Sequence, residues 1–383
     1  MISNSTRCTP ADENFILKIQ LYLGGWTSLF ICLFGLMGTF ISILVFGNTR
    51  MRTLSTNTYL LALSITNFIW LLLYIITQAL RFILIIPNFI EHNDEKRVSV
   101  YNQLYDRSSP YVIPLMNTFQ LCSIYYTVAA SVDRYLYISC GVKSDRYCTV
   151  RTALKIIIIL TLFSSLCVLP NWLKYRAIQH IDIETNRTRY KLELTQVGQH
   201  LRFRQIFHVY GYIPIVYVLP SSILIITTLL TIRKLFQFRL QRQCLINTVP
   251  NKRHSITSML IALVLVFLLC RFPMLINHIY EQQKSITSDY DNIPQKFFLR
   301  CRIRRSFNTI VNFLQIINAS GHLIIYCIFN EHFRRITKEI ICLLRVKAKH
   351  KQKECIEDIT YDCVHACYTK KRRTATQITT IDL

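Results

Sequence analysis

Seven long segments of this chain contain almost no charged residues. A helix needs about 20 mostly apolar residues to cross a bilayer, and in lipid the backbone must satisfy its own hydrogen bonds. One such window could be the buried helix of a soluble protein, but seven windows separated by polar connectors favour seven transmembrane helices. Only 17% of the residues are charged, against about a quarter in soluble domains. The windows are 19–49, 53–80, 108–132, 156–173, 205–232, 254–280 (interrupted only by Arg271) and 306–330.

The predicted fold is therefore all-α: an integral membrane protein with a seven-transmembrane helix bundle and a short amphipathic helix after the seventh span. That last helix places apolar and basic residues on opposite faces, as interfacial helices do. The expected spans are 22–47, 57–86, 110–140, 152–173, 206–236, 254–281 and 305–329, with an N-terminal segment 1–21, the amphipathic helix at 331–345 and a tail at 346–383.

The charges of the connectors predict the orientation in the membrane. The connector after the first span carries Arg50 and Arg52 without an acid, and the tail carries "KKRR" at 370–373, so the positive-inside rule puts both inside. Two glycosylation sequons begin at Asn4 and Asn186; four spans separate them, so they share a face. We expect an extracellular N-terminus, a cytoplasmic C-terminus and a plasma-membrane location. The polar start lacks a signal-peptide pattern, so the first helix is expected to direct insertion.

Several motifs occur in the order and spacing of one receptor family. They are "TNTYLLALSITN" at 56–67, "SVDRY" at 131–135, "FLLCRFP" at 267–273 and "NASGHLIIYCIFNEHFRR" at 318–335. Across most of its length the chain resembles the rhodopsin-like (class A) G-protein-coupled receptors. In "YVIPLMNTFQLCSIYYTVAASVDRYLYI" and "YCTVRTALK" it resembles the invertebrate FMRFamide-type neuropeptide receptors in particular.

This resemblance implies a receptor that binds an extracellular peptide, of the FMRFamide-like class, and activates a heterotrimeric G protein, with arrestin as a further partner of the tail. No H-E-x-x-H, P-loop, G-x-S-x-G or G-x-G-x-x-G motif occurs, so we expect no enzyme activity, no cofactor and no metal. No nucleic-acid partner is expected, and the lipid bilayer is the expected environment. One alternative is a small-molecule chemosensory receptor of the same fold. A transporter or channel is another, but it would predict an internal repeat and charged residues along a pore.

An acid and a base end the third apolar window, and the resemblance assigns them to the G-protein switch. A buried arginine in a helix bundle is costly unless it is paired or reaches the interface, and the adjacent acid is its expected partner. The alternative is an interfacial anchor without a switching role. The predicted switch residues are Asp133, Arg134, Tyr135 and Tyr326.

A second switch is predicted on the sixth helix, where Arg271 takes the place of the family's tryptophan. A charge at that depth costs about 2.5–3.5 kcal/mol on insertion scales, so it should face the bundle. It could bond to polar groups such as Gln120 or Gln315, or it could couple a ligand carbonyl or carboxylate to helix movement. The residues of this switch are Phe267, Cys270, Arg271 and Pro273.

Helix periodicity predicts a broad pocket of mixed polar and aromatic residues, as a peptide ligand requires. Met116 stands where amine receptors have an acid, and the seventh window has no lysine for a Schiff base. Each candidate alone could equally be a helix–helix hydrogen bond. The candidates are Tyr74, Gln78, Arg81, Asn117, Gln120, Tyr212, His278, Glu281, Asn308, Asn312 and Gln315.

The chain also departs from the family pattern. Asn67 replaces the acidic sodium ligand, and His322-Leu323 replaces Asn-Pro in the seventh helix, so the proline kink there should be lost. Ser109 replaces the third-helix cysteine, and residues 174–204 contain no cysteine.

Other cysteines suggest modifications. On an oxidising outer face Cys8 and Cys301 are expected to pair, and Cys342 is placed for palmitoylation. The cysteines and histidine at positions 355–367 match no standard zinc-finger spacing.

Overall fold

The structure is a computed structural model that describes residues 10–84, 100–140, 144–182, 187–244, 252–287 and 301–342. It divides into two compact units, Met1–Asn330 and Glu331–Leu383. The first unit contains the helix bundle and is described first.

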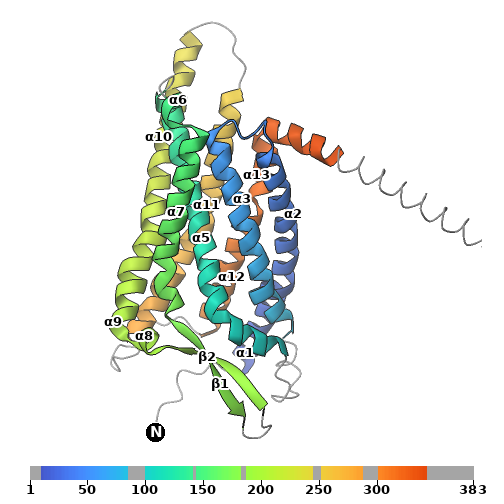
Figure 1. Ribbon diagram of the computed structural model, residues 1–383, viewed down its shortest axis with the longest axis vertical. Coiled ribbons are helices and arrows are strands. Elements are labelled where there is room, and N and C mark those ends of the chain that lie inside the picture. Colours follow the sequence, from blue (N-terminus) through green and yellow to red (C-terminus); the bar gives the residue numbers. More distant parts are fainter. Residues whose placement is uncertain are drawn as a thin grey trace, which may run out of the picture. The chain divides into compact units, whose positions relative to one another are not determined.

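Long helices dominate the first unit (Figure 1). Within the part of the chain that the structure describes, five helices pass as membrane spans by length and hydropathy, and a bent pair makes a sixth. In chain order the elements are α1 (Pro10–Ile19), η1 (Gln20–Thr27), α2 (Ser28–Gly47), α3 (Ser55–Tyr74), η2 (Ile75–Ala79), α5 (Val100–Cys140), α6 (Ser144–Tyr147), α7 (Val150–Trp172), β1 (Tyr175–Asp182), β2 (Arg187–Leu194), α8 (Gln196–Gln199), α9 (Leu201–Arg204), η4 (Gln205–Tyr212), η5 (Pro214–Val218), α10 (Leu219–Cys244), α11 (Lys252–Thr287), α12 (Cys301–Ser320) and α13 (His322–Phe329).

Helix α5, the third span in chain order, brings the number of spans among the described residues to seven. Serine, threonine, tyrosine and amide side chains interrupt its apolar sequence, and it packs against α3, α7 and α10. Because it faces other helices more than lipid, it can be more polar than its neighbours. It begins at Val100, earlier than predicted, and continues through Pro110 and Pro114. The all-α class and the seven-helix bundle are confirmed, with one short hairpin as an exception.

The bundle buries apolar side chains at its helix contacts and shows others on its outer surface. One core cluster joins α5, α7, α10 and α11 around Ile124 and Phe267, and another joins α2, α3, α5 and α12 around Leu71 and Ile316. By contrast, Leu166 of α7 is 68% exposed and Leu269 of α11 is 73% exposed. An exposed apolar surface of this extent fits contact with lipid.

Close packing of α2 against α12 depends on a glycine. A Cβ atom added at Gly35 would lie 2.5 Å from the Cβ of Ser320 and 3.0 Å from its Cα. Any larger side chain would separate the two helices, as expected for small-residue contacts in membranes.

The seventh span bends without a proline. Helices α12 and α13 meet at an angle of 41°, so the span is bent although it lacks a proline kink. The bend falls at Ser320-Gly321, and Ser/Gly pairs are recurrent kink sites. The Ser320 hydroxyl donates to the carbonyl of Ile316 at 2.6 Å, a back-bond that bends helices.

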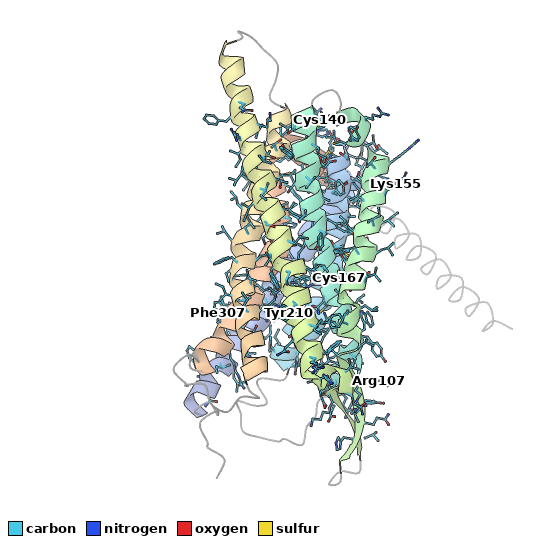
Figure 2. The ribbon with its side chains drawn as sticks, turned by 90° about the vertical axis from the view of Figure 1, so that its left-hand side faces the viewer. Arg107, Cys140, Lys155, Cys167, Tyr210 and Phe307 are labelled. Atoms are coloured by element: carbon cyan, nitrogen blue, oxygen red, sulfur yellow. The ribbon has the colours of Figure 1, made fainter. Side chains whose placement is uncertain are left out.

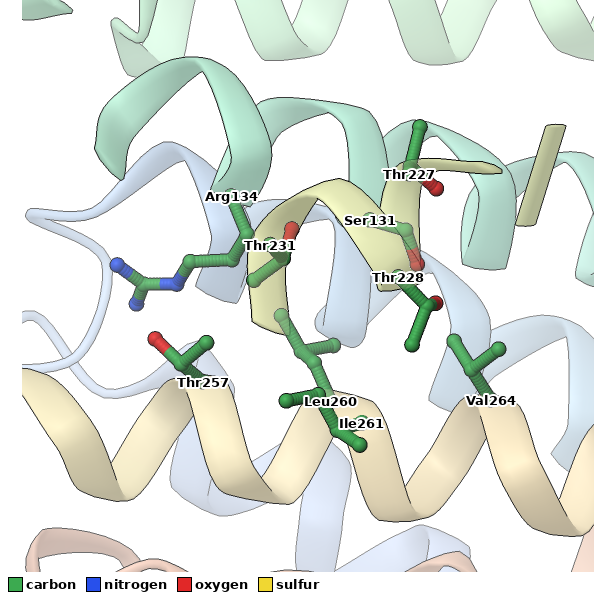
Figure 3. Close-up of a pocket in the computed structure, with 9 residues that line it drawn as sticks. All are labelled: Ser131, Arg134, Thr227, Thr228, Thr231, Thr257, Leu260, Ile261 and Val264. Carbon is green, nitrogen blue, oxygen red and sulfur yellow. The ribbon is translucent and has the colours of Figure 1, made fainter. Parts of the chain in front are cut away.

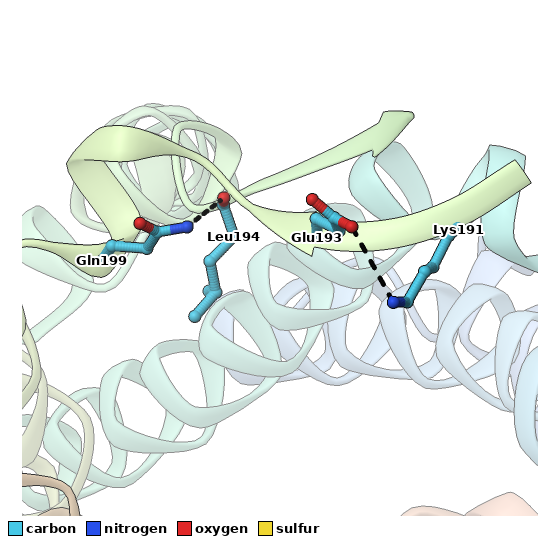
Figure 4. Close-up of polar contacts among 4 residues, drawn as sticks. All are labelled: Lys191, Glu193, Leu194 and Gln199. Atoms are coloured by element: carbon cyan, nitrogen blue, oxygen red, sulfur yellow. Dashed lines mark hydrogen bonds and ion pairs between the residues drawn. The ribbon is translucent and has the colours of Figure 1, made fainter. Parts of the chain in front are cut away.

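Antiparallel strands β1 and β2 form a hairpin at one end of the bundle, called here the hairpin end (Figure 1). Their register runs from Tyr175 opposite Leu194 to Asp182 opposite Arg187. Close to the bundle, the Gln199 side chain donates to the carbonyl of Leu194 at 3.2 Å (Figure 4). A surface ion pair joins Lys191 to Glu193 at 3.9 Å in the same view.

The hairpin packs against α5 without a covalent tie. The guanidinium carbon of Arg107 lies 5.3 Å from the centre of the Tyr190 ring, a cation–π contact between α5 and β2. Figure 2 shows Arg107 at the hairpin end of α5 and Cys140 at the opposite end, called here the Arg134 end.

In the second unit, residues 331–342 form a helix. Phe333 and Ile336 are buried, whereas Arg334, Arg335 and Lys338 are exposed. This division matches the expected amphipathic helix over the part that the structure describes.

Candidate functional site

Arg134 lies near the last turns of α5 and is only 4% exposed. Its Nε and Nη2 atoms are buried and have no hydrogen-bond partner. Its guanidinium carbon stands 5.3 Å from the ring centre of Tyr137, and it forms no ion pair with any residue that the structure describes. Burying an unpaired charge is expensive, and such groups in a native fold call for a functional explanation.

A small pocket adjoins this arginine between three helices (Figure 3). It has room for about one water molecule. Arg134 extends from α5 between α10 and α11 (Figure 3). The lining is largely hydroxylic on one side and apolar on the other: Ser131 and Arg134 from α5, Thr227, Thr228 and Thr231 from α10, and Thr257, Leu260, Ile261 and Val264 from α11.

Asp133 pairs with another helix rather than with Arg134. Its Oδ2 accepts hydrogen bonds from the hydroxyls of Thr56 at 2.6 Å and Ser55 at 2.9 Å. Both donors lie in the first turn of α3, where the helix dipole favours an anion. The expected Asp133–Arg134 pairing is thus replaced by a clamp between α5 and α3.

The backbone of Asp133 also has a neighbour. The Cys148 thiol, in the connector before α7, lies 3.7 Å from the Asp133 carbonyl oxygen. Burial, followed by the charge of Asp133, raises the pKa of Cys148 to about 11. The thiol therefore stays protonated and can donate to this carbonyl.

The other predicted switch residues are embedded in packing contacts. Tyr326 is fully buried, and its ring meets Phe46 of α2 edge-on at 5.1 Å. Phe267 and Cys270 are buried in α11, and Tyr135 is half-buried. Helix α11 continues through Pro273.

Asn67 connects three helices in the middle of the bundle. Its Nδ2 donates to Nδ1 of His322 at 3.0 Å, and its Oδ1 accepts from the hydroxyl of Ser123 at 2.8 Å. All the groups are neutral when the proton of His322 is on Nε2. The two departures from the family pattern, at Asn67 and at His322, therefore compensate each other by direct contact.

Removing this contact should destabilise the bundle. His322→Ala would leave the buried Asn67 amide without its acceptor, so we expect the free energy of unfolding to fall by about 1 kcal/mol. Thermal unfolding of the detergent-solubilised protein measures this, with Ile324→Ala, at a position 49% exposed, as the matched control. Equal stability of the two variants would remove the structural role assigned to His322.

Arg271 lies in an aromatic environment near the middle of α11. It is 7% exposed, and its Nη1 has no hydrogen-bond partner. Its guanidinium carbon is 5.5 Å from the Phe267 ring centre, and Tyr212 and Tyr217 lie within electrostatic range. It forms no hydrogen bond with Gln120 or Gln315, so the pairing considered for it is not observed.

Tyr212, Tyr217 and His278 form a ring cluster beside this arginine. Their ring centres are 6.2 Å apart for the two tyrosines, 5.6 Å for Tyr212–His278 and 5.3 Å for Tyr217–His278. The structure thus brings two predicted pocket residues, Tyr212 and His278, together with Arg271. We call Arg271, Tyr212, Tyr217 and His278 the Arg271 cluster.

Helix periodicity did not predict Tyr217 as a pocket residue, because the segment that carries it is a π-helix rather than an α-helix. Segments η4 and η5 are π-helical, with hydrogen bonds between residues five apart. Residues 212 and 217 therefore point the same way, whereas an α-helix would turn them apart. The aromatic–Pro run around Pro214 was the only sequence signal.

Other predicted pocket residues occupy separate places. Tyr74 is buried against Trp70 at 5.3 Å between ring centres, as a core residue. Arg81 stacks on Tyr105 at 4.2 Å. Asn308 accepts from Asn277 at 3.1 Å. Gln315 is buried with an unpartnered Nε2, and Gln78, Asn117, Gln120 and Asn312 are half-buried.

Several predicted sites lie outside the described residues or side chains. This applies to Asn4, Asn186, Cys8, Glu281 and Cys301, so glycosylation and the Cys8–Cys301 bridge stay predictions. Cys342, at the end of helix 331–342, is exposed, and its palmitoylation also stays a prediction.

Comparison with known proteins identifies the class of this seven-helix chain. Residues 26–344 match the model of the serpentine type 7TM GPCR chemoreceptor Srw family. The chain belongs to that family of G-protein-coupled receptors, and it is therefore a receptor of the membrane.

Curated relatives give a weaker likeness. The chain is 24% identical over 83% of its length to a Drosophila melanogaster protein named FMRFamide receptor, and 25% identical over 80% of its length to FMRFamide peptide receptor frpr-18 of Caenorhabditis elegans. It spans 54% and 66% of those two proteins.

Proposed function

We propose that this receptor is gated by an extracellular peptide and that its Arg134 end promotes nucleotide exchange on a heterotrimeric G protein. The observation that carries the proposal is the buried Arg134 guanidinium, with two unpartnered nitrogens beside a threonine-rich pocket. An arginine offers five N–H donors, and the C-terminus of a helix presents unsatisfied carbonyls. Movement of α11 away from α5 would let Arg134 meet such a helix end on the G protein.

The orientation that we propose puts the hairpin end outside the cell. The sequon at Asn186 falls in the connection between β1 and β2. At the opposite end, the connector between α2 and α3 carries Arg50 and Arg52 without an acid, as cytoplasmic connectors do. The C-terminal tail would then be cytoplasmic and open to arrestin, with Cys342 available for palmitoylation.

The peptide class of the ligand rests on the two relatives named as FMRFamide receptors and on the rhodopsin-like motifs. The description of the Srw family as chemoreceptors favours a second candidate, a small-molecule chemosensory receptor. Both candidates use the same Arg134 end and differ only in what enters the bundle from the hairpin end.

The test is nucleotide exchange by the purified full-length receptor in lipid nanodiscs. The ligand panel contains neuropeptides, each as an amidated and as a free-acid form, and small organic molecules. Peptide-dependent exchange supports the first candidate, and a response confined to small molecules replaces it by the second. Exchange that no ligand and no activating substitution can accelerate would contradict the G-protein role.

A further inference from the structure

The Arg271 cluster is rich in donors and in positive charge. The side chains of Arg271 in α11 and Tyr217 in η5 lie close enough to interact with each other, but Arg271 Nη1 and the Tyr217 hydroxyl are buried and form no hydrogen bond of good geometry. An unpartnered buried donor costs free energy, and such groups in a native fold call for a functional explanation.

None of the charged groups close to Arg271 that the structure describes is an acid. Its electrostatic neighbours are the phenols of Tyr217 and Tyr212 and the thiol of Cys270. Those of His278 are two further bases, Arg271 and Lys174. Lys174 is the residue before β1, at the hairpin end. Positive charge therefore lies near the cluster on two sides, from Arg271 of α11 and from Lys174.

The environment of Arg271 disfavours a cationic ligand group and favours a carboxylate. A cationic group would meet Arg271 without a counter-charge. A neutral amide would offer one carbonyl acceptor. A carboxylate offers two oxygens in the plane that a guanidinium fork matches, with shorter and stronger charge-assisted bonds.

We propose that the Arg271 cluster is the binding subsite for a carboxylate of the activating ligand, held by Arg271 and Tyr217. This deepens the proposed receptor function and rests on it for the step from binding to activation. Two sources offer this carboxylate: a peptide, through its free C-terminus or an acidic side chain, and a small organic acid. The chemistry at Arg271 is the same for both. A C-terminally amidated peptide lacks the terminal charge, so it would occupy this subsite through an acidic side chain.

Binding is tested apart from signalling, by thermal stabilisation of the purified full-length receptor. The probes are peptides as free-acid and amidated twins, peptides in which Asp or Glu is exchanged for Asn or Gln, and small carboxylates beside their primary amides. We expect at least one carboxylate probe to stabilise the receptor where its amide twin does not. Arg271→Gln should weaken this probe roughly tenfold to a hundredfold, Tyr217→Phe should weaken it less, and Arg305→Gln, at an exposed arginine of α12, should leave it unchanged.

Arg271→Lys separates charge from geometry, because lysine keeps the charge without the fork; intermediate affinity is expected. The peptide and small-acid probes distinguish the two sources of the carboxylate. The proposal is overturned if no acid probe exceeds its amide twin, or if Arg271→Gln leaves the preference intact. Stabilisation by an acid probe without nucleotide exchange would uphold the subsite while contradicting the G-protein role.

Discussion

Arg134→Ala is expected to abolish nucleotide exchange while leaving the receptor folded and at the cell surface. The guanidinium is buried, and its Nε and Nη2 atoms have no partner. The resting fold therefore gains little from this side chain. Removing a buried charge that forms no ion pair with a described residue should leave thermal stability unchanged or raise it. A large loss of function without a loss of stability is expected of a side chain that serves the activity of a protein rather than its folding.

The measurement pairs thermal unfolding with nucleotide exchange on the same purified samples. Arg146→Ala is the matched control, because Arg146 of α6 is an exposed arginine at the same end of the bundle. If Arg134 is only an interfacial anchor, Arg134→Ala should lose stability or surface expression and keep its exchange activity per folded molecule. That result would contradict the switch.

Asp133→Asn is expected to raise basal nucleotide exchange by roughly tenfold. The carboxylate clamps α5 to the first turn of α3 through Ser55 and Thr56, and hydrogen bonds to a charged group contribute about 1.5–3 kcal/mol. Weakening a clamp present in the resting bundle shifts the population toward the active state by a similar free energy. The exchange rate without any ligand measures this.

The reciprocal change tests whether the clamp or the charge is responsible. Ser55→Ala combined with Thr56→Val removes both donors and leaves Asp133 charged. A similar rise in basal exchange would assign the effect to the hydrogen bonds. Unchanged basal exchange in all of these variants would show that the α3–α5 contact does not restrain the receptor.

The helices and the Arg134 end could be predicted because they depend on local sequence. Uncharged windows identify spans, and an adjacent acid and base at the end of one window indicate a site. The hydrogen-bond partners of Asp133 could not be predicted from local sequence. Ser55 and Thr56 are more than 75 positions away in the chain, and only the packing of α3 on α5 brings them close.

Two further features depend on backbone geometry that periodicity does not reveal. The π-helical turns of η4 and η5 bring Tyr217 to the face of Tyr212, against the α-helical period. The bend before His322 arises from Ser320-Gly321 rather than from a proline. The family pattern suggested that the bend was lost, whereas the chain forms it by other means.

The most direct test of G-protein activation through Arg134 needs no knowledge of the ligand. It compares the guanine-nucleotide exchange rates of purified heterotrimers with the Asp133→Asn receptor and with the Asp133→Asn/Arg134→Ala receptor, both full-length and in nanodiscs. We expect Asp133→Asn to accelerate exchange on at least one heterotrimer and the double variant to return it to the rate without receptor. Acceleration that persists in the double variant, or that is absent from Asp133→Asn on every heterotrimer, would contradict the mechanism.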